Sequence, residues 1–279
     1  MKTPDMPPPP SQTTQPAIFT VPAPSFHPPR IVLNAVEGWG KTTAGAFAPK
    51  PAFLTIGPET GYHALLDSAR APAIPTHHVT TWADLLSSLR SILSSPGTFE
   101  TIVLDTIGAA ERLCHEHVCH NQFRDDWGDK GFMSYQKGYD LALVDWTSLL
   151  ALLDQLRSKG LTVLLLGHTA VRTFKNPVGA DYDQFASDMN AKTSWPTTRK
   201  WADLVLFGNY ITVLENVDTK GKKAGAAIGG YDRILYTTHR DAWDAKSRYP
   251  IPSEIRIPDD HTTVWATIWN AIRSCIISQ

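Results

Sequence analysis

Short apolar runs alternate with longer amphipathic segments from residue 30 onward. Five runs consist mostly of apolar residues and predict buried parallel strands at residues 31–35, 52–56, 101–105, 162–167 and 204–207. The apolar spacing between the runs predicts helices at residues 42–47, 60–69, 82–93, 107–120 and 135–159. This alternation predicts an α/β fold with a central, mostly parallel, twisted sheet flanked by helices.

The pattern changes near residue 209. Residues 210–217 and 232–238 alternate as strands do, and the Gly- and Lys-rich residues 218–230 between them predict a β-hairpin with a long loop. Residues 262–277 have the apolar spacing of an amphipathic helix, with Trp265 and Trp269 expected in the core. We therefore expect one domain, residues 30–279, that ends in a hairpin and a helix.

Residues 1–29 have a different composition, because they hold ten of the 21 prolines. Proline removes backbone donors and favours extended polyproline II over packed structure. We expect a flexible proline-rich tail rather than a partner-binding proline motif.

Charge and cysteine content narrow the function classes. The chain has 26 basic and 27 acidic residues, so any nucleic-acid surface must be local. Three cysteines are too few and too unevenly placed for a secreted disulfide framework. The sequence has neither a signal peptide nor the roughly 20 apolar residues of a membrane span, so we expect a soluble cytoplasmic protein without a membrane partner.

The first candidate site follows the strand at residues 31–35. The segment Gly38-Trp39-Gly40-Lys41-Thr42 between a strand and a helix predicts a P-loop, in which backbone N–H groups surround phosphates. Lys41 supplies positive charge and Thr42 a hydroxyl ligand for Mg²⁺. The expected nucleotide-binding residues are Val36, Glu37, Gly38, Trp39, Gly40, Lys41, Thr42 and Thr43. Ala35 replaces the usual first glycine.

Polar residues also follow three other predicted strands. Asp105 ends a strand that we expect beside the P-loop strand, where it can hold Mg²⁺ together with Thr42. Glu59 can orient and deprotonate the attacking water, or it can serve as the N-terminal carboxylate of the next helix. His168 can sense the γ-phosphate, or it can be a satisfied buried histidine.

The order of these parts resembles the RecA-like recombinase core, and especially the small phage-type RecA-like ATPases that act in single-strand annealing or recombination. The resemblance covers residues 30 to about 255. It rests on the P-loop, Glu59 in Gly-Pro-Glu-Thr-Gly, Asp105, and Gly167-His168-Thr169. Residues 245–252, Ala-Lys-Ser-Arg-Tyr-Pro-Ile-Pro, also look like the basic-x-basic motif of that family.

The resemblance implies roles by position. Glu59 would activate water, and His168, where recombinases commonly have glutamine, would couple nucleotide state to a DNA-binding loop. Lys246 and Arg248 would act in trans on the nucleotide of a neighbouring subunit. The family also implies ATP and Mg²⁺ as cofactors, with single-stranded DNA, further copies of the chain and a single-strand-binding protein as partners. A phage-encoded protein in a bacterial host fits this family.

Two segments correspond to the DNA-contacting regions of RecA-like proteins, residues 120–139 and 170–200. The second is the better candidate, because it mixes cations for phosphate pairing with aromatic rings for base stacking. Its expected DNA-binding residues are Arg172, Phe174, Lys175, Lys192, Arg199 and Lys200. This segment also contains three carboxylates that offset its positive charge, Asp181, Asp183 and Asp188. The alternative is therefore a surface loop that packs on a neighbouring subunit.

Cys114, Cys119 and three nearby histidines raise the question of a zinc site. They lack a second ligand pair and C-x₂-C spacing, so we favour a helix that happens to contain Cys and His residues over a zinc site. The leading hypothesis is therefore a DNA-dependent, RecA-like ATPase that promotes annealing or strand exchange. The alternatives are a P-loop helicase or motor subunit, and a nucleotide-switched interaction protein with little turnover.

Overall fold

A computed structural model describes residues 27–95, 97–215 and 226–276. Most of the expected proline-rich tail, part of the predicted hairpin loop and the last three residues lie outside this part of the chain. Within it, the carbonyl oxygens of Pro28 and Pro29 accept hydrogen bonds from Arg157 Nε and the Val163 N–H. The chain is therefore joined to the sheet just before the first strand.

The first half of the chain alternates strands and helices as expected. Its elements are β1 (Arg30–Ala35), α1 (Lys41–Ala46), β2 (Pro51–Ile56), α2 (Gly61–Asp67), β3 (Thr76–Val79), α3 (Trp82–Leu93), β4 (Thr101–Asp105), α4 (Ile107–Phe123), a 3₁₀ turn η1 (Ser134–Gln136) and α5 (Lys137–Ser158). Strand β3 was missed because its residues are mostly polar, and the structure shows three of the four side chains exposed.

The second half extends the sheet and adds a projecting hairpin. Its elements are β5 (Thr162–Phe174), β6 (Tyr182–Ser187), α6 (Ser194–Trp201), β7 (Leu204–Glu215), β8 (Ala226–Tyr236), β9 (Lys246–Ser247), β10 (Glu254–Ile257), a 3₁₀ turn η2 (His261–Thr263) and α7 (Val264–Ile276). Strands β7 and β8 form the predicted antiparallel pair. Strands β6, β9 and β10 and helix α6 were not predicted, and β5 continues well beyond residue 167.

The strand order is β10-β8-β7-β1-β5-β4-β2-β3, with β6 paired to β5 and β9 to β7. Strands β7, β1, β5, β4, β2 and β3 run parallel, which confirms the predicted α/β fold with a mostly parallel sheet. One expectation was wrong, because β4 does not lie beside the P-loop strand β1. Strand β5 lies between them, so Asp105 reaches the P-loop from one strand further along the sheet.

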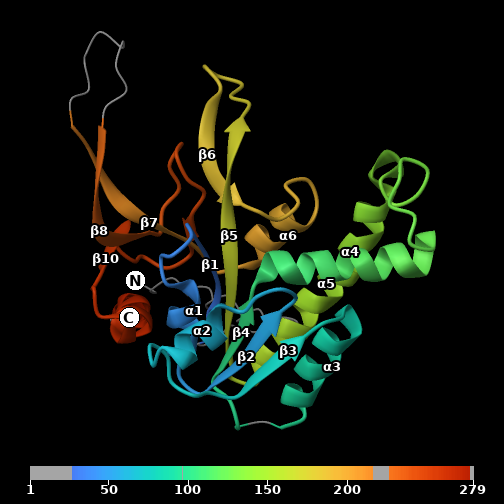
Figure 1. Cartoon of the computed structure of the whole chain (residues 1–279), viewed down its shortest axis with the longest axis horizontal. Helices are drawn as coiled ribbons and strands as arrows, with labels where there is room; N and C mark the ends of the chain where they lie inside the picture. The colour runs from blue at the N-terminus through green and yellow to red at the C-terminus, as the bar shows by residue number, and fades with distance from the viewer. Residues whose placement is uncertain (1–26, 96, 216–225, 277–279) are drawn as a thin grey trace, which may run out of the picture.

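Helices cover both faces of the sheet (Figure 1). Helices α3, α4 and α5 pack into one apolar cluster, and α1, α2 and α7 pack into the other. The predicted core face of α7 is confirmed by Val264, Trp265, Ile268 and Ile272, all of which are buried. This arrangement brings the carboxyl ends of the parallel strands and the N-terminus of α1 to one edge of the sheet.

Candidate active site

The P-loop joins β1 to α1 through two glycines with positive φ. Gly38 has a φ of 74° and Gly40 a φ of 108°, in the left-handed region that favours glycine. The Trp39 side chain between them is fully buried, and its Nε1 donates to the Ile234 carbonyl. Of the predicted nucleotide-binding residues, Trp39 can therefore offer its backbone but not its ring to phosphates.

Ala35 fits the position that usually holds the first P-loop glycine. It pairs across the sheet with Gly208, and a Cβ added at Gly208 would lie 2.8 Å from that of Ala35 and 2.5 Å from the Trp39 ring. Gly208 therefore supplies the space that Ala35 and Trp39 occupy. A small residue on the neighbouring strand thus accommodates the departure from the usual motif.

Lys41 begins α1 and is almost completely buried. Its Nζ donates to the carbonyl oxygens of Ala35 at 2.9 Å and Val36 at 3.2 Å. Burial lowers the pKa of Lys41, and the nearby Asp105 and Glu59 oppose that shift. Among the described residues, no side chain caps α1. The loop therefore combines a pre-positioned ammonium group with uncapped backbone donors, as phosphate binding requires.

Thr42 and Asp105 lie next to each other, as predicted for a metal site. Thr42 Oγ1 donates to Asp105 Oδ2 at 2.9 Å. Burial raises the pKa of Asp105 to about 6, although the Thr42 hydroxyl opposes this shift. A buried carboxylate and a hydroxyl are hard oxygen ligands, so the pair fits Mg²⁺ held together with nucleotide phosphates. Bound Mg²⁺ would neutralise phosphate charge there.

Glu59 and His168 form one hydrogen-bonded unit. His168 Nε2 lies 3.3 Å from Glu59 Oε1, and Thr106 Oγ1 donates to the same oxygen at 3.3 Å. The hydrogen bond to His168 lowers the pKa of Glu59, and the same bond raises the pKa of His168. His168 is half-buried rather than enclosed in the core, so the alternative of a satisfied core histidine is not what the structure shows.

These groups line one pocket of about 330 Å³. Its lining includes Glu37, Gly38, Gly40, Lys41, Thr42, Thr43, Glu59, Asp105 and His168 among the predicted residues. Gly61, Leu65, Arg70 and His261 also line it and were not predicted. Arg70 follows α2 and His261 begins η2, so no local motif in the sequence connects them with the P-loop.

The predicted trans-acting residues lie at the start of β7, whereas the P-loop strand ends beside Gly208 in the middle of β7. Lys246 in β9 pairs with Val205, and its Nζ donates to the carbonyl oxygens of Arg199, Lys200 and Ala202 at the end of α6. Arg248 Nη1 forms an ion pair with Asp203 at 2.8 Å. Both side chains thus have partners within the chain, and their role toward a second subunit stays a prediction.

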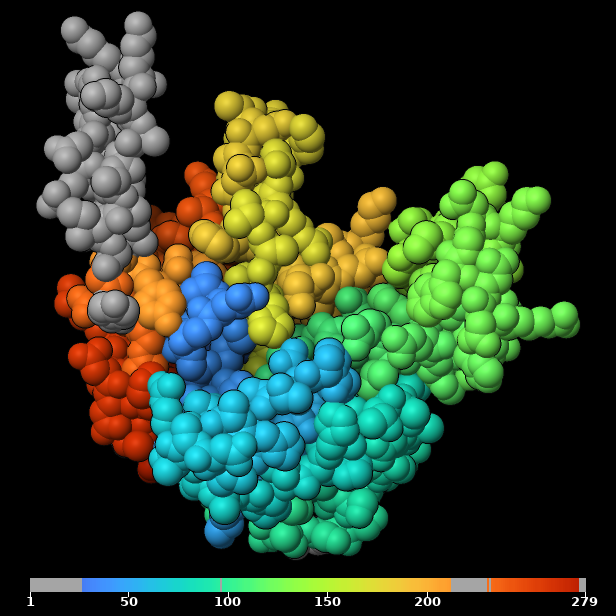
Figure 2. Space-filling view, viewed as in Figure 1, coloured from blue at the N-terminus to red at the C-terminus, as the bar shows by residue number. Residues whose placement is uncertain are grey.

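The β5–β6 hairpin carries three of the predicted DNA-binding residues and projects from the body (Figures 1 and 2). Phe174 is 46% exposed and stacks on Tyr182 with ring centroids 5.2 Å apart. Lys175 pairs with Asp181 at 2.5 Å, and Arg172 donates to the carbonyl oxygens of Asp188 and Met189. Lys175 is exposed but its charge is balanced by Asp181, so the hairpin offers exposed rings and apolar side chains more than net positive charge.

The other three predicted DNA-binding residues lie on α6 and just before it. Arg199 pairs with Asp244 at 2.9 Å, whereas Lys192 and Lys200 are exposed. The segment ahead of α6 is held by the buried Glu111 of α4, which accepts from the Asn190 N–H and the Ser194 hydroxyl. Burial raises the pKa of Glu111 to about 7. Sequence reasoning missed this anchor because it joins distant segments.

The earlier candidate segment, residues 120–139, forms the connection between α4 and α5. It exposes Trp127, Met133 and Tyr135, the last of which is fully exposed. Phe132 is buried beside these residues against His115 and Tyr139. This second projecting surface offers rings for stacking, but it is not continuous with a strand of the nucleotide pocket.

Cys114 and Cys119 are residues of α4 and belong to the apolar cluster that α3, α4 and α5 form. Cys114 Sγ lies 3.4 Å from the Ala142 carbonyl oxygen, and burial lowers the pKa of His115 to about 4. Among the described residues, no group of three His, Cys, Asp or Glu side chains is arranged to hold a metal ion. Nor is any described helix long and apolar enough to cross a bilayer.

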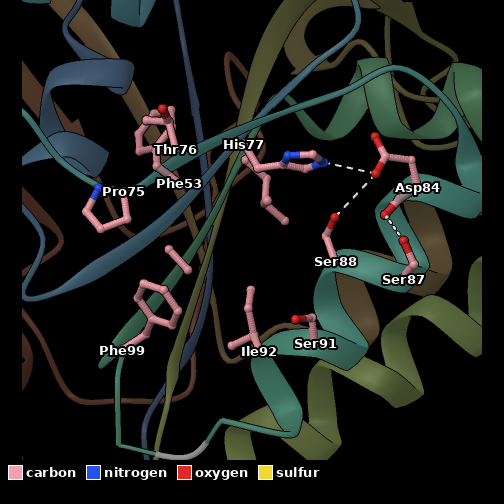
Figure 3. Close-up of a pocket in the computed structure, with 12 residues that line it drawn as sticks. Phe53, Pro75, Thr76, His77, Asp84, Ser87, Ser88, Ser91, Ile92 and Phe99 are labelled. Atoms are coloured by element: carbon pink, nitrogen blue, oxygen red, sulfur yellow. Dashed lines mark hydrogen bonds and ion pairs between the residues drawn. The ribbon is translucent and has the colours of Figure 1, made fainter.

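A second pocket of about 460 Å³ lies between the edge strand β3 and α3 (Figure 3). His77 Nε2 lies 2.9 Å from Asp84 Oδ1, and the Ser88 hydroxyl donates to the same carboxylate oxygen at 3.5 Å. His77 and Ser88 both contact the Asp84 carboxylate, and Figure 3 marks no contact between His77 and Ser88 themselves. A serine–histidine–aspartate site needs the histidine between the serine and the carboxylate, and here Asp84 lies between His77 and Ser88 instead.

Comparison with known proteins agrees with this geometry. A search of curated proteins found none that matches the chain. Residues 27–249 match a family model described as an AAA domain. The matched range includes the P-loop, Glu59, Asp105 and His168. Since the match spans most of the sequence and the structure has a P-loop NTPase core, the chain belongs to this AAA domain family.

Proposed function

We propose that the protein is a Mg²⁺-dependent ATPase whose turnover is stimulated by single-stranded DNA. As a homo-oligomer it would promote annealing or strand exchange in phage-type homologous recombination. The AAA domain match supports ATP binding and hydrolysis. The DNA activity rests on the resemblance to RecA-like ATPases and on the hairpin described above.

One observation supports coupling between the ATP site and the proposed DNA-binding hairpin. Strand β5 contains both His168, which is bonded to Glu59, and Phe174, which is exposed near the end of the strand. The two residues are six positions apart along the strand, about 20 Å. A change at the γ-phosphate that breaks the Glu59–His168 bond would therefore act on the base of the hairpin through a continuous, paired strand.

The hairpin suits stacking better than phosphate pairing. Lys175 and Arg172 have partners within the chain, whereas Phe174 and Tyr182 offer a pair of stacked rings. Aromatic rings stack on bases of any sequence, and each such contact contributes about 1–3 kcal/mol. We infer binding of single strands with little sequence preference.

ATP hydrolysis measured with and without single-stranded DNA tests this function. Phe174→Ala should lower DNA affinity and DNA stimulation about tenfold, because a stacking contact is lost. Tyr135→Ala compares the two candidate segments, since it removes an exposed ring from residues 120–139, and it should change DNA stimulation less than Phe174→Ala does. If DNA changes neither hydrolysis nor mobility at low salt, the proposed function is wrong. Unwinding of a tailed duplex would instead indicate a helicase.

A second candidate is a nucleotide-switched interaction protein with little turnover. The observation that favours it is the bond from His168 to Glu59, which lowers the pKa of the carboxyl group and makes it a weaker base. Tight ATP binding with no turnover under any DNA condition would support this candidate over the first.

A further inference from the structure

Three basic side chains meet beside the nucleotide pocket. Arg70 Nη2 lies 3.1 Å from His261 Nε2, and Arg233 Nη1 lies 3.4 Å from His261 Nδ1. Arg70 and His261 line the pocket itself. They come from the segment after α2 and from η2, while Arg233 comes from β8. Three separate parts of the chain therefore converge on one wall of the pocket.

Arg233 and His261 lie on the other side of the P-loop strand from the proposed metal site, and Arg70 reaches this side through its contact with His261. In the sheet, β8 and β10 lie on one side of β1, and the strands that carry Asp105 and His168 lie on the other. A nucleotide whose phosphates contact Lys41 and Thr42 has its metal end near Asp105. Its nucleoside end can then extend the other way within the pocket, toward His261 and the Arg70 that contacts it, with Leu65 on the same wall.

Arg233 is fixed in place. It is 4% exposed, and it donates to the carbonyl oxygens of Trp39 at 3.2 Å, Asp259 at 3.3 Å and Pro258. A Cβ added at Gly40 would lie 3.0 Å from Arg233 Nη1. The guanidinium group thus joins the P-loop to the segment that leads into His261, and it is not free to turn toward a ligand.

His261 cannot accept hydrogen bonds from both arginines at once. Burial and the two arginines lower the pKa of His261, which favours the neutral ring, and a neutral imidazole has one acceptor nitrogen. Guanidinium groups only donate. Since Arg233 is held by carbonyl oxygens and Arg70 is exposed, Arg70 is the group that can leave His261 and contact a ligand.

We propose that Arg70 and His261 bind the nucleoside end of ATP, with the planar guanidinium group of Arg70 stacked on the base. The inference rests on the proposed function only in that the pocket binds ATP. Guanidinium planes stack on aromatic rings, and Leu65 adds an apolar surface to the same wall. A neutral His261 adds a ring without adding charge. None of the ion pairs among the described residues involves Arg70.

Calorimetric binding of Mg-ATP and of Mg-tripolyphosphate tests the proposal, because tripolyphosphate has no nucleoside. Arg70→Ala should weaken ATP binding about tenfold and change tripolyphosphate binding less than about twofold. His261→Ala should show the same pattern. Arg90→Ala, an exposed arginine on α3 outside the pocket, is the matched control and should change neither.

Two results would overturn the inference. Unchanged ATP affinity in Arg70→Ala would show that the residue does not contact the nucleotide, and an equal loss for both ligands would show that it contacts phosphate. Both results leave the proposed function intact, because the wild-type protein still binds ATP. Failure of the wild-type protein to bind ATP would overturn the proposed function and, with it, this inference.

Discussion

His168 Nε2 lies 3.3 Å from Glu59 Oε1, so the carboxylate that follows β2 and the imidazole of β5 act as one unit. The two residues are far apart in sequence, and only the parallel sheet brings them together. Thr106, which follows β4, donates to the same oxygen. The carboxyl ends of three neighbouring strands thus converge on one carboxylate, at the edge where sheets of this kind bind ligands.

Glu59→Gln should leave ATP binding intact and lower the rate of hydrolysis by about 10²-fold or more, because a neutral amide cannot take a proton from water. Single-turnover hydrolysis and calorimetric ATP affinity measure the two effects separately. Glu116→Gln is the matched control, since Glu116 is exposed on α4 and does not line this pocket. Normal turnover in Glu59→Gln would show that Glu59 is not the base.

Lys41→Ala should abolish detectable ATP binding and hydrolysis, because it removes the buried ammonium group of the pocket that is expected to contact the phosphates. Lys50→Ala is the matched control, since Lys50 is exposed and pairs with Glu100 at the other end of β2. Circular dichroism should show that both variants are folded. Retained ATP affinity in Lys41→Ala would contradict the assignment of the phosphate site.

His168→Ala should reduce stability most in mildly acidic solution. The raised pKa of His168 contributes stability below its ordinary value of 6.5 that is lost as the pH rises. The lowered pKa of Glu59 contributes stability above 4.5 that is lost as the pH falls. Both contributions are present between about 4.5 and 6.5, where the loss of Tm in His168→Ala should be largest.

His120→Ala provides the comparison for this pH profile. His120 pairs with Asp125 at 3.1 Å, but both side chains are mostly exposed, so the pair should contribute little. The same His168→Ala variant should shift the acidic limb of the ATPase profile to higher pH, because Glu59 loses the partner that lowers its pKa. A Tm loss that does not vary with pH would contradict this account of the pair.

Asp105→Asn should stabilise the ligand-free protein at neutral pH while weakening binding of Mg-ATP. Burial raises the folded-state pKa of Asp105 from 3.8 to about 6, so ionisation costs stability as the pH rises through that interval. Asparagine does not ionise and has no such cost, so the free energy of unfolding of Asp105→Asn should exceed that of the wild type by at most about 3 kcal/mol above pH 7. Thermal unfolding at pH 5 and pH 8, with and without Mg-ATP, measures both effects. A lower Tm than wild type at pH 8 without ligand would contradict the prediction.

Much of the site could be predicted from sequence because each part is local. A P-loop needs glycines, Lys41 and Thr42 within a few residues, and Asp105 needs only an apolar strand before it. The strand order could not be read in the same way, because the apolar run of β5 looks like that of any other buried strand. Only the hydrogen-bonded register shows that β5 lies between β1 and β4.

The residues that sequence reasoning missed share a different property. Arg70, Arg233 and His261 belong to segments that are distant in sequence, and each is an ordinary residue in its own segment. Their relation to the P-loop arises only when η2 packs beside α1 and Arg233 of β8 donates to the Trp39 carbonyl oxygen. Glu111 is similar, since its buried carboxyl group is explained only by the backbone of Asn190.

Lys246 and Arg248 can stabilise their own subunit or act on the nucleotide of a neighbouring subunit, and experiments with mixed variants separate these two roles. Each side chain already has partners within the chain, so Lys246→Ala should lower the Tm by freeing the carbonyl oxygens at the end of α6. If the pair also acts on a neighbouring subunit, Arg248→Ala should lack turnover alone. Mixed with Lys41→Ala, it should regain part of the turnover, because one subunit then supplies an intact P-loop and the other an intact Arg248. Turnover that stays at the sum of the two separate variants would assign both residues to the stability of the subunit alone.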